Sequence, residues 1–385
     1  MIVSYNLFYI VFFVSASFLY ISIFVKRYFK EHSKVNDVLG IILICLFSVW
    51  ASLRPFTVPD TSNYLGIFNV LDKISFTFEG IFSRVKIVDS EFGFSYITKY
   101  LREQGISFRL YLFIMAIIIN ITTVIGIKFI CEYIDKKHKY DYFTVFVLFL
   151  IFLGLHNFNV ALRAGLSIGF GLFAIGIYLK YEKLLISCLF IILSMLFQSM
   201  GIAFILILLS IILPIKFKKK HFIIIWCVSI ALVVLRLPGF LALYIVKLLG
   251  LLTSIIGVSA FNQYLEATVG GGSVPINIIF RVFTLGFITW IAYRNDKRYA
   301  KIALIVSLGI FAQAICYPLE GLYRVMEYFF MFIIPIIAID IKNSRKGLVK
   351  KDLEYLLYYV FLIMQIRLCY SPDEVGQENV FYLIT

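Results

Sequence analysis

Charged residues are scarce in this chain, and that scarcity already excludes many classes of protein. Only 15% of its 385 residues are charged, whereas 62% are hydrophobic. Soluble domains usually carry about 25% charged residues. Many of the apolar runs approach the roughly 20 residues that a helix needs to cross a bilayer. The composition therefore excludes an ordinary soluble domain and predicts an all-α polytopic integral membrane protein.

Cysteine and histidine are also few, and they are poorly placed for chemistry. The six cysteines are scattered within or at the ends of apolar runs, without a CxxC pair or a Cys/His spacing typical of zinc sites. Of the four histidines, only His156 is expected near the outer face. No phosphate-binding Walker loop and no carboxylate cluster with metal spacing is present. We therefore expect no disulfide framework, no metal and no cofactor.

The net charge of +14 is best interpreted as a topology signal rather than as a nucleic-acid footprint. Basic residues concentrate in loops that stay cytoplasmic. Basic clusters lie at residues 26–34, 136–139, 180–183, 216–220, 294–301 and 342–351. Assigning all of them to the cytoplasm gives a consistent alternation over about twelve spans, with both termini outside.

This topology makes residues 1–385 a single transmembrane domain with two long outer-face loops. The first loop covers residues 54–108 and the second covers 238–275. Residues 240–260 are apolar enough to form another span, but counting them so would place three basic clusters outside. We therefore expect a re-entrant or interfacial helix in the second loop.

The first outer loop opens with LRPFTVPDTSNY, which we expect to be a shaped loop. Pro55 and Pro59 remove backbone donors and fix φ, so a helix cannot continue through them. The segment places Arg54 at a membrane boundary, with Asp60 and Tyr64 a short distance further on. An arginine beside a carboxylate suits an anionic ligand whose neighbouring hydroxyl must lose a proton. A capped helix end with a snorkelling arginine is the alternative.

Arg163 is the sharpest candidate among the arginines expected near the outer face or inside spans. It lies in ALRAGLSIGFG at the outer start of a predicted span, where small residues let helices pack closely. An arginine at a helix N-terminus is a good anion-binding group, because the helix dipole adds to its hydrogen bonds. A structural pair with a carboxylate elsewhere in the chain is the alternative.

A late segment, LEGLYRVMEYFFMF, brings another arginine together with two carboxylates. Arg324 is expected at the outer start of a span, beside Tyr323 and between Glu320 and Glu327. Glu327 lies about one turn into the membrane, where a carboxylate needs an arginine or a ligand hydroxyl. A local pair with Arg324 is the plainer explanation. In the first loop, Glu91 is either a site carboxylate or an anion at a helix N-terminus.

These motifs follow one another in a recognisable order. LRPFTVPDTSNY is followed by SEFGF, LRAGLS, FQSMGIAF and YRVMEYFFMFIIP, spread over most of the chain. The order resembles that of the EpsG-like branch of the Wzy-type polysaccharide polymerases, which include O-antigen and capsule polymerases. There are two departures. Four residues separate Pro55 from Asp60, and Gln198 stands where such proteins commonly carry histidine.

The resemblance implies a GT-C-like membrane glycosyltransferase of the bacterial inner membrane. Such an enzyme joins undecaprenyl-pyrophosphate-linked oligosaccharide repeats at the outer face, independently of metal and of nucleotide sugars. Arginines can stabilise the diphosphate leaving group by fixed positive charge, and a carboxylate within reach of the acceptor hydroxyl can act as its base. The expected partners are the lipid-linked oligosaccharide, membrane lipid, and a chain-length regulator and flippase of the same pathway.

The candidate site residues then divide into two groups by expected role. The expected catalytic residues are Asp60, Glu91 and Glu327. The expected substrate-binding residues are Arg54, Tyr64, Arg163, Gln198, Glu320, Tyr323 and Arg324. Arg163 and Arg324 together are expected to hold the lipid pyrophosphate. Two alternatives remain open: an O-antigen ligase-like transferase that uses the same donor, and a polysaccharide flippase or transporter.

Overall fold

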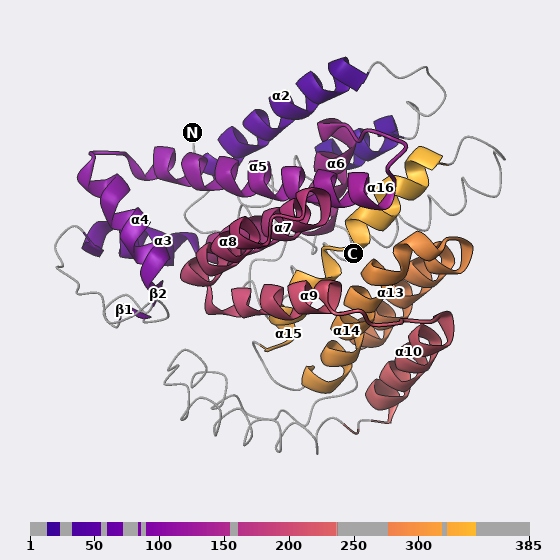
Figure 1. Ribbon diagram of the computed structural model, residues 1–385. Helices are drawn as coiled ribbons and strands as arrows, with labels where there is room; N and C mark the ends of the chain where they lie inside the picture. Colours follow the sequence, from indigo (N-terminus) through magenta and orange to yellow (C-terminus); the bar gives the residue numbers. More distant parts are fainter. Residues whose placement is uncertain are drawn as a thin grey trace.

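The computed structural model is almost entirely helical wherever it describes the chain (Figure 1). The described residues are 14–23, 33–54, 60–71, 84–85, 90–154, 161–235, 237, 276–317 and 322–343. The expected second outer loop and the acidic C-terminal tail lie outside these ranges. An all-helical membrane fold is therefore confirmed, apart from one short strand pair.

The elements follow one another along the chain with these bounds. After the helix Val14–Ile23 come α2 (Ser33–Ser52), α3 (Thr61–Val70), β1 (Arg84–Val85), β2 (Ser90–Glu91), α4 (Phe92–Glu103), α5 (Phe108–Ile134), α6 (Tyr142–Phe149) and the π-helical η2 (Leu150–Gly154). They are followed by α7 (Leu162–Tyr181), α8 (Leu184–Phe197), the 3-10 helix η4 (Ser199–Ile202), α9 (Ala203–Ile212) and α10 (Lys219–Val234). The last are α13 (Ile276–Asn295), η6 (Lys297–Tyr299), α14 (Ala300–Cys316), α15 (Leu322–Phe330) and α16 (Ile333–Asn343).

In the described part of the chain, four helical stretches are long and apolar enough to cross a membrane: Lys34–Ser52, Phe108–Ile134, Leu162–Tyr181 and Lys297–Cys316. Shorter apolar helices accompany them, including Leu184–Phe197 and Ser199–Ile212. The chain is thus a multi-helix membrane protein. The count of about twelve spans and the GT-C-like arrangement remain predictions.

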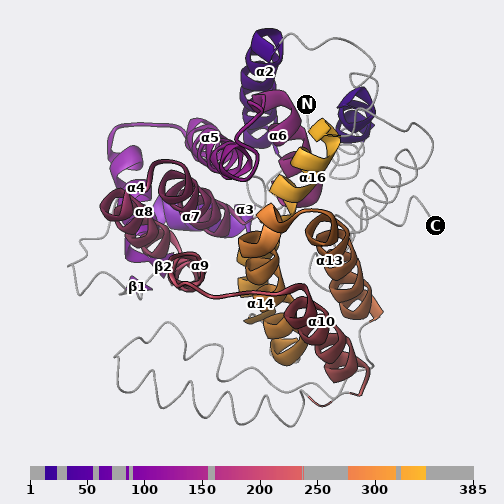
Figure 2. The same cartoon turned by 45° about the vertical axis from the view of Figure 1, so that its right-hand side comes forward.

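The helices form two groups that the views in Figures 1 and 2 separate clearly. One group contains α5, α7 and α8, with α2 and α6 against α5, and the other contains α10, α13 and α14. Close packing in the first group depends on Gly126 of α5. A Cβ at Gly126 would lie 2.6 Å from the backbone at Leu172 and Phe173 of α7, so only glycine permits this approach.

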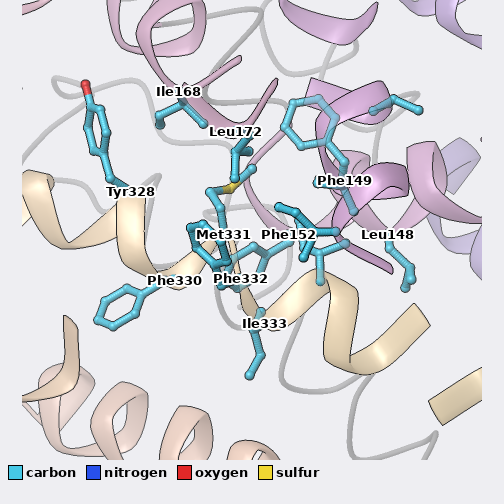
Figure 3. Packing of buried hydrophobic residues seen from close by; sticks show 14 of the residues in the cluster. Leu148, Phe149, Phe152, Ile168, Leu172, Tyr328, Phe330, Met331, Phe332 and Ile333 are labelled. Carbon is cyan, nitrogen blue, oxygen red and sulfur yellow. The ribbon is translucent and has the colours of Figure 1, made fainter. Parts of the chain in front are cut away.

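Two helices with a sharp break between them connect the groups. α15 packs against α14 and α9, whereas α16 packs against α5, α6 and α13. The apolar run 325–341 is therefore not one continuous helix, because it is interrupted at Met331 and Phe332. Pro335 explains the break, since its ring would clash with the carbonyl of Met331 in a continuous helix. Figure 3 shows Met331 and Phe332 inside a cluster of buried apolar side chains, with Tyr328 at its edge.

Several of the basic loops predicted to be cytoplasmic meet at one end of the helices. Arg298, after α13, lies with Nη1 3.2 Å from Asp135 Oδ1, at the C-terminal end of α5. Asp135 also accepts hydrogen bonds from Tyr140 and contacts the His138 ring. Burial alone would raise the pKa of Asp135, but these hydrogen bonds outweigh it and lower the pKa. The carboxylate therefore stays charged and ties two basic loops together.

The opposite end of α5 lies about 40 Å away, given its 27 residues. There Arg109 Nη1 donates to the carbonyl oxygens of Ser52, at 2.7 Å, and of Arg54. These are carbonyl groups at the end of α2 that its own helix cannot satisfy. The beginning of the first outer loop is thus fastened to the start of α5, far from the basic loops.

This arrangement predicts the labelling of two exposed positions at the two ends. A cysteine at Gln104 should react with an impermeant thiol reagent in whole cells, because the loop after α4 is expected outside. A cysteine at Lys137 should not react until the cells are opened. The signal is measured above that of the parent chain, whose Cys45 and Cys227 are exposed. The opposite pattern would contradict the topology.

Candidate functional site

The residues from separate motifs converge on an ion pair between Arg163 and Glu91. Arg163 is the second residue of α7, and Glu91 ends β2 directly before α4. Arg163 Nη1 lies 3.0 Å from Glu91 Oε2, with the arginine side chain 30% exposed and the glutamate 10%. The pair therefore lies at the surface end of α7, where one partner remains accessible.

Local structure explains why Glu91 is placed so accurately. β1 and β2 pair antiparallel with Glu91 opposite Arg84, and the chain turns directly into α4. A Cβ at Gly93 would lie 2.7 Å from Leu196, so α4 approaches the end of α8 more closely than another residue allows. Phe94 is fully buried and packs on the Tyr64 ring at a centroid distance of 5.6 Å. The SEFGF motif therefore fixes the position of Glu91 between α3, α7 and α8.

The second oxygen of Glu91 faces the break between α8 and η4. Its Oε1 accepts a long hydrogen bond, 3.4 Å, from the backbone N–H of Ser199. The preceding residue, Gln198, is extended and ends α8. Its Oε1 accepts a hydrogen bond of 3.0 Å from the Tyr328 hydroxyl of α15. Gln198 therefore links the Arg163–Glu91 pair to the YRVMEYF motif.

Asp60 and Tyr64 also interact with Arg163. Asp60 adopts a left-handed conformation with φ of 62° directly before α3, and its carbonyl accepts from the Tyr64 N–H at 2.8 Å. Burial and the charge of Asp60 raise the pKa of Tyr64 to about 12, although Arg163 and Arg54 act against the shift. The phenol is therefore neutral at physiological pH and can donate a hydrogen bond, but cannot act as a base.

Asp60 differs from Glu91 in its surroundings. Its side chain is half-buried and does not cap α3, although it stands at the N-terminal end of that helix. Its charge reaches both Arg163 and Tyr64. Arg54, by contrast, is fully buried, and its charge also acts on Tyr64. Among these groups Asp60 is the carboxylate that combines access with a nearby arginine.

Glu327 has a partner on another helix that its sequence neighbourhood does not indicate. Its Oε1 lies 4.0 Å from Nη2 of Arg281 in α13, and both side chains are buried. Arg324 and Tyr323 lie in the first turn of α15, but their side chains are outside the described part of the structure. Glu320 and His156 also lie outside it. Their predicted roles stay predictions.

The run Gly165–Gly169 has the G-x-S-x-G spacing of a hydrolase nucleophile. It lies inside α7, however, and not at a strand-to-helix turn, where such a serine would be exposed. Ser167 is buried, and its Oγ lies 2.9 Å from Ser194 Oγ of α8. This serine pair joins two helices and gives no support to a serine nucleophile.

Three residues of this region were not assigned roles from the sequence. Ser199 donates its backbone N–H, Tyr328 holds Gln198, and Arg281 faces Glu327. Tyr328 and Ser199 lie within the YRVMEYF and FQSMGIAF motifs, so the sequence could have indicated that they belong to the site. For Arg281, the only signal in the sequence was a charged residue inside a predicted span. Within the described residues, no group of three or more His, Cys, Asp or Glu side chains is placed to hold a metal ion.

The Tyr328–Gln198 contact predicts a modest effect. Tyr328→Phe removes only the hydroxyl, so polymer formation, the activity that the resemblance of the motifs implies, should fall by about two- to tenfold, the usual worth of one neutral hydrogen bond. Polymer amount on a glycan gel at equal membrane abundance measures it. Tyr293→Phe, which removes a 2.7 Å bond to the Phe217 carbonyl near the basic loops, is the matched control and should leave polymer unchanged. Equal loss in both variants would contradict a specific role for Gln198.

Comparison with known proteins gives one family and no individual relative. No curated protein and no solved structure matches the chain. The model of the EpsG family matches residues 37–381, which include most of α2, the complete site and the late YRVMEYF motif. This match agrees with the motif order and covers far more than half of the sequence. The chain belongs to the EpsG family.

Proposed function

We propose that this chain polymerises undecaprenyl-pyrophosphate-linked oligosaccharide repeats by glycosyl transfer at the outer face of the bacterial inner membrane. The EpsG family is associated with glycosyltransferase-like polymerase activity. The observation that carries the proposal is the Arg163–Glu91 pair at the surface end of α7, with Asp60 and Tyr64 beside it. A guanidinium cation, two carboxylates and a neutral hydrogen-bond donor therefore lie close together at one end of the membrane helices.

Each group has a defined part in the proposed reaction. The acceptor hydroxyl oxygen forms a bond to the anomeric carbon of the donor sugar, and the bond from that carbon to the diphosphate breaks. The bonding electron pair leaves with the diphosphate, whose charge Arg163 stabilises by directed hydrogen bonds. Asp60 takes the hydroxyl proton. Glu91 holds the guanidinium in place, and Arg324 is the second proposed diphosphate ligand.

The deciding experiment uses the purified full chain in lipid vesicles. The substrate is the lipid-linked repeat extracted from a strain that lacks this chain. We expect a ladder of lipid-linked polymer and release of undecaprenyl diphosphate. Transfer of a repeat only to an added acceptor other than a second lipid-linked repeat would favour the ligase-like alternative. Movement of the substrate across the vesicle membrane with no new glycosidic bond would favour a transporter and contradict the proposal.

A further inference from the structure

A second arginine–glutamate pair lies between α13 and α15, apart from the Arg163–Glu91 pair. The guanidinium of Arg281 is 6% exposed and stacks over the Phe330 ring at 4.9 Å. Its Nη2 lies 4.0 Å from Glu327 Oε1, which is too far for a hydrogen bond. Nε and Nη2 of Arg281 find no acceptor anywhere in the described part of the chain. A buried cation thus presents one complete edge without a hydrogen bond.

A third buried polar side chain, on α14, also has an atom that lacks a hydrogen-bond partner among the described residues. Gln313 is 1% exposed, and its Oε1 finds no donor among the described residues. α14 and α15 run antiparallel, and a Cβ at Gly309 would lie 2.6 Å from Phe329 Cβ. One turn further along α14, Gln313 is therefore expected at the level of Val325 and Met326, directly before Glu327 in α15. Within the described residues, arginine donors and a carboxamide acceptor on neighbouring helices are thus both unsatisfied.

Such a combination is costly for a protein unless something else completes it. Each buried polar atom without a partner loses its hydration and gains nothing in return. A phosphate is a poor match, because the Glu327 carboxylate would repel it. A hydroxyl fits both sides, since it donates to a carboxylate or amide oxygen and accepts from a guanidinium. Sugars present several such hydroxyls on one rigid ring.

We propose that Arg281, Glu327 and Gln313 form a saccharide subsite that binds hydroxyl groups of the lipid-linked repeat. This inference rests on the proposed function and deepens it. Glu327 directly precedes Tyr328, whose hydroxyl bonds Gln198, and the next residue, Ser199, bonds Glu91. The subsite is therefore connected by contiguous contacts to the Arg163–Glu91 pair. The diphosphate binds at Arg163, and the sugar reaches towards Arg281.

Two lipid probes separate sugar binding from phosphate binding. One is the lipid-linked repeat extracted from a strain lacking this chain, and the other is undecaprenyl diphosphate without sugar. Affinities are measured by native mass spectrometry on the purified full chain. The test variant is Arg281→Gln, Glu327→Gln, which removes both charges and leaves neither buried alone. Its affinity for the repeat-bearing lipid should fall about ten- to a hundredfold, with that for the sugar-free lipid unchanged.

Two further variants keep the test decisive. Thr289→Val removes a buried hydroxyl of α13 that likewise finds no partner in the described residues, and it should bind both probes as the wild type does. If the double variant is poorly folded by its thermal unfolding, Arg281→Lys replaces it. That variant keeps the charge but loses the planar edge, and it should weaken only repeat binding.

The remaining outcomes overturn the inference in distinguishable ways. Equal loss for both lipids would make Arg281 a phosphate ligand. No loss for either lipid would make the pair purely structural. In both cases the proposed polymerase function stands, because the wild-type chain still binds its substrate. A wild-type chain that binds neither lipid would contradict the proposed function and the subsite together.

Discussion

Replacing Arg163 with alanine should reduce polymer formation by about one to two orders of magnitude. A charge-assisted hydrogen bond to the leaving diphosphate contributes about 1.5–3 kcal/mol, which converts to that change in rate. Arg163 is suited to this role because it stands at the N-terminal end of α7 and is partly exposed, while Glu91 holds it at 3.0 Å. The measurement is the initial rate of polymer formation in vesicles with extracted lipid-linked repeat.

The lysine variant separates positioning from charge. Arg163→Lys keeps a cation that can still pair with Glu91 but loses the planar two-pronged contact, so its rate should fall between those of wild type and alanine. It also avoids leaving Glu91 as a lone buried charge, which could by itself destabilise the alanine variant. Membrane abundance and thermal unfolding are therefore recorded for both variants.

Arg298 provides the matched control for a lost arginine. It forms ion pairs with Asp135 and Asp296 near the basic loops, at the other end of the helices. Arg298→Gln should leave the rate of polymer formation unchanged at equal abundance. Wild-type rates from a well-folded Arg163→Ala chain, or equal losses in the two variants, would contradict the assignment of Arg163 to the diphosphate.

Much of the helical framework was predictable, because it follows from local composition. The apolar run 184–197 and the start of a span at Leu162 correspond to the observed bounds of α8 and α7. A run of apolar residues between basic clusters specifies a membrane helix with little help from its neighbours. The interruption at Met331 and Phe332 also has a local cause, Pro335, although apolar composition conceals it.

The partners of charged residues were not predictable in the same way. Glu91 and Arg163 are 72 positions apart, and the packing of α8 against both α4 and α7 brings them together. Arg281 of α13, which no spacing along α15 indicates, lies opposite Glu327. Sequence spacing identifies pairs within one helix, whereas pairs between helices depend on rotation and depth. The roles of the candidate residues stay predictions.

Asp60→Asn should nearly abolish polymer formation, whereas Glu91→Gln should reduce it less. Loss of a general base costs about a hundred- to ten-thousandfold in rate. Asp60 suits that role because its carboxylate is half-buried and lies near both Arg163 and Tyr64. Glu91 is a weaker candidate for the base, since its two carboxylate oxygens already contact Arg163 and the Ser199 N–H.

The two variants remove charge at different places and keep the surrounding backbone, and this makes the comparison informative. In Glu91→Gln the new amide oxygen can still accept the Ser199 N–H, so η4 stays in place while Arg163 loses its counter-ion. Asp60→Asn keeps the shape of the turn before α3, because asparagine also tolerates the left-handed conformation. Both substitutions therefore change charge with little change in volume.

Glu132→Gln is the matched control, since Glu132 pairs with Lys180 at 2.5 Å close to the basic loops. It should retain the wild-type rate at equal abundance. If Asp60→Asn retains the wild-type rate while Glu91→Gln removes it from a well-folded chain, Glu91 is the base. Arg163 would then position this base, and the proposed contact with the diphosphate would need a different residue.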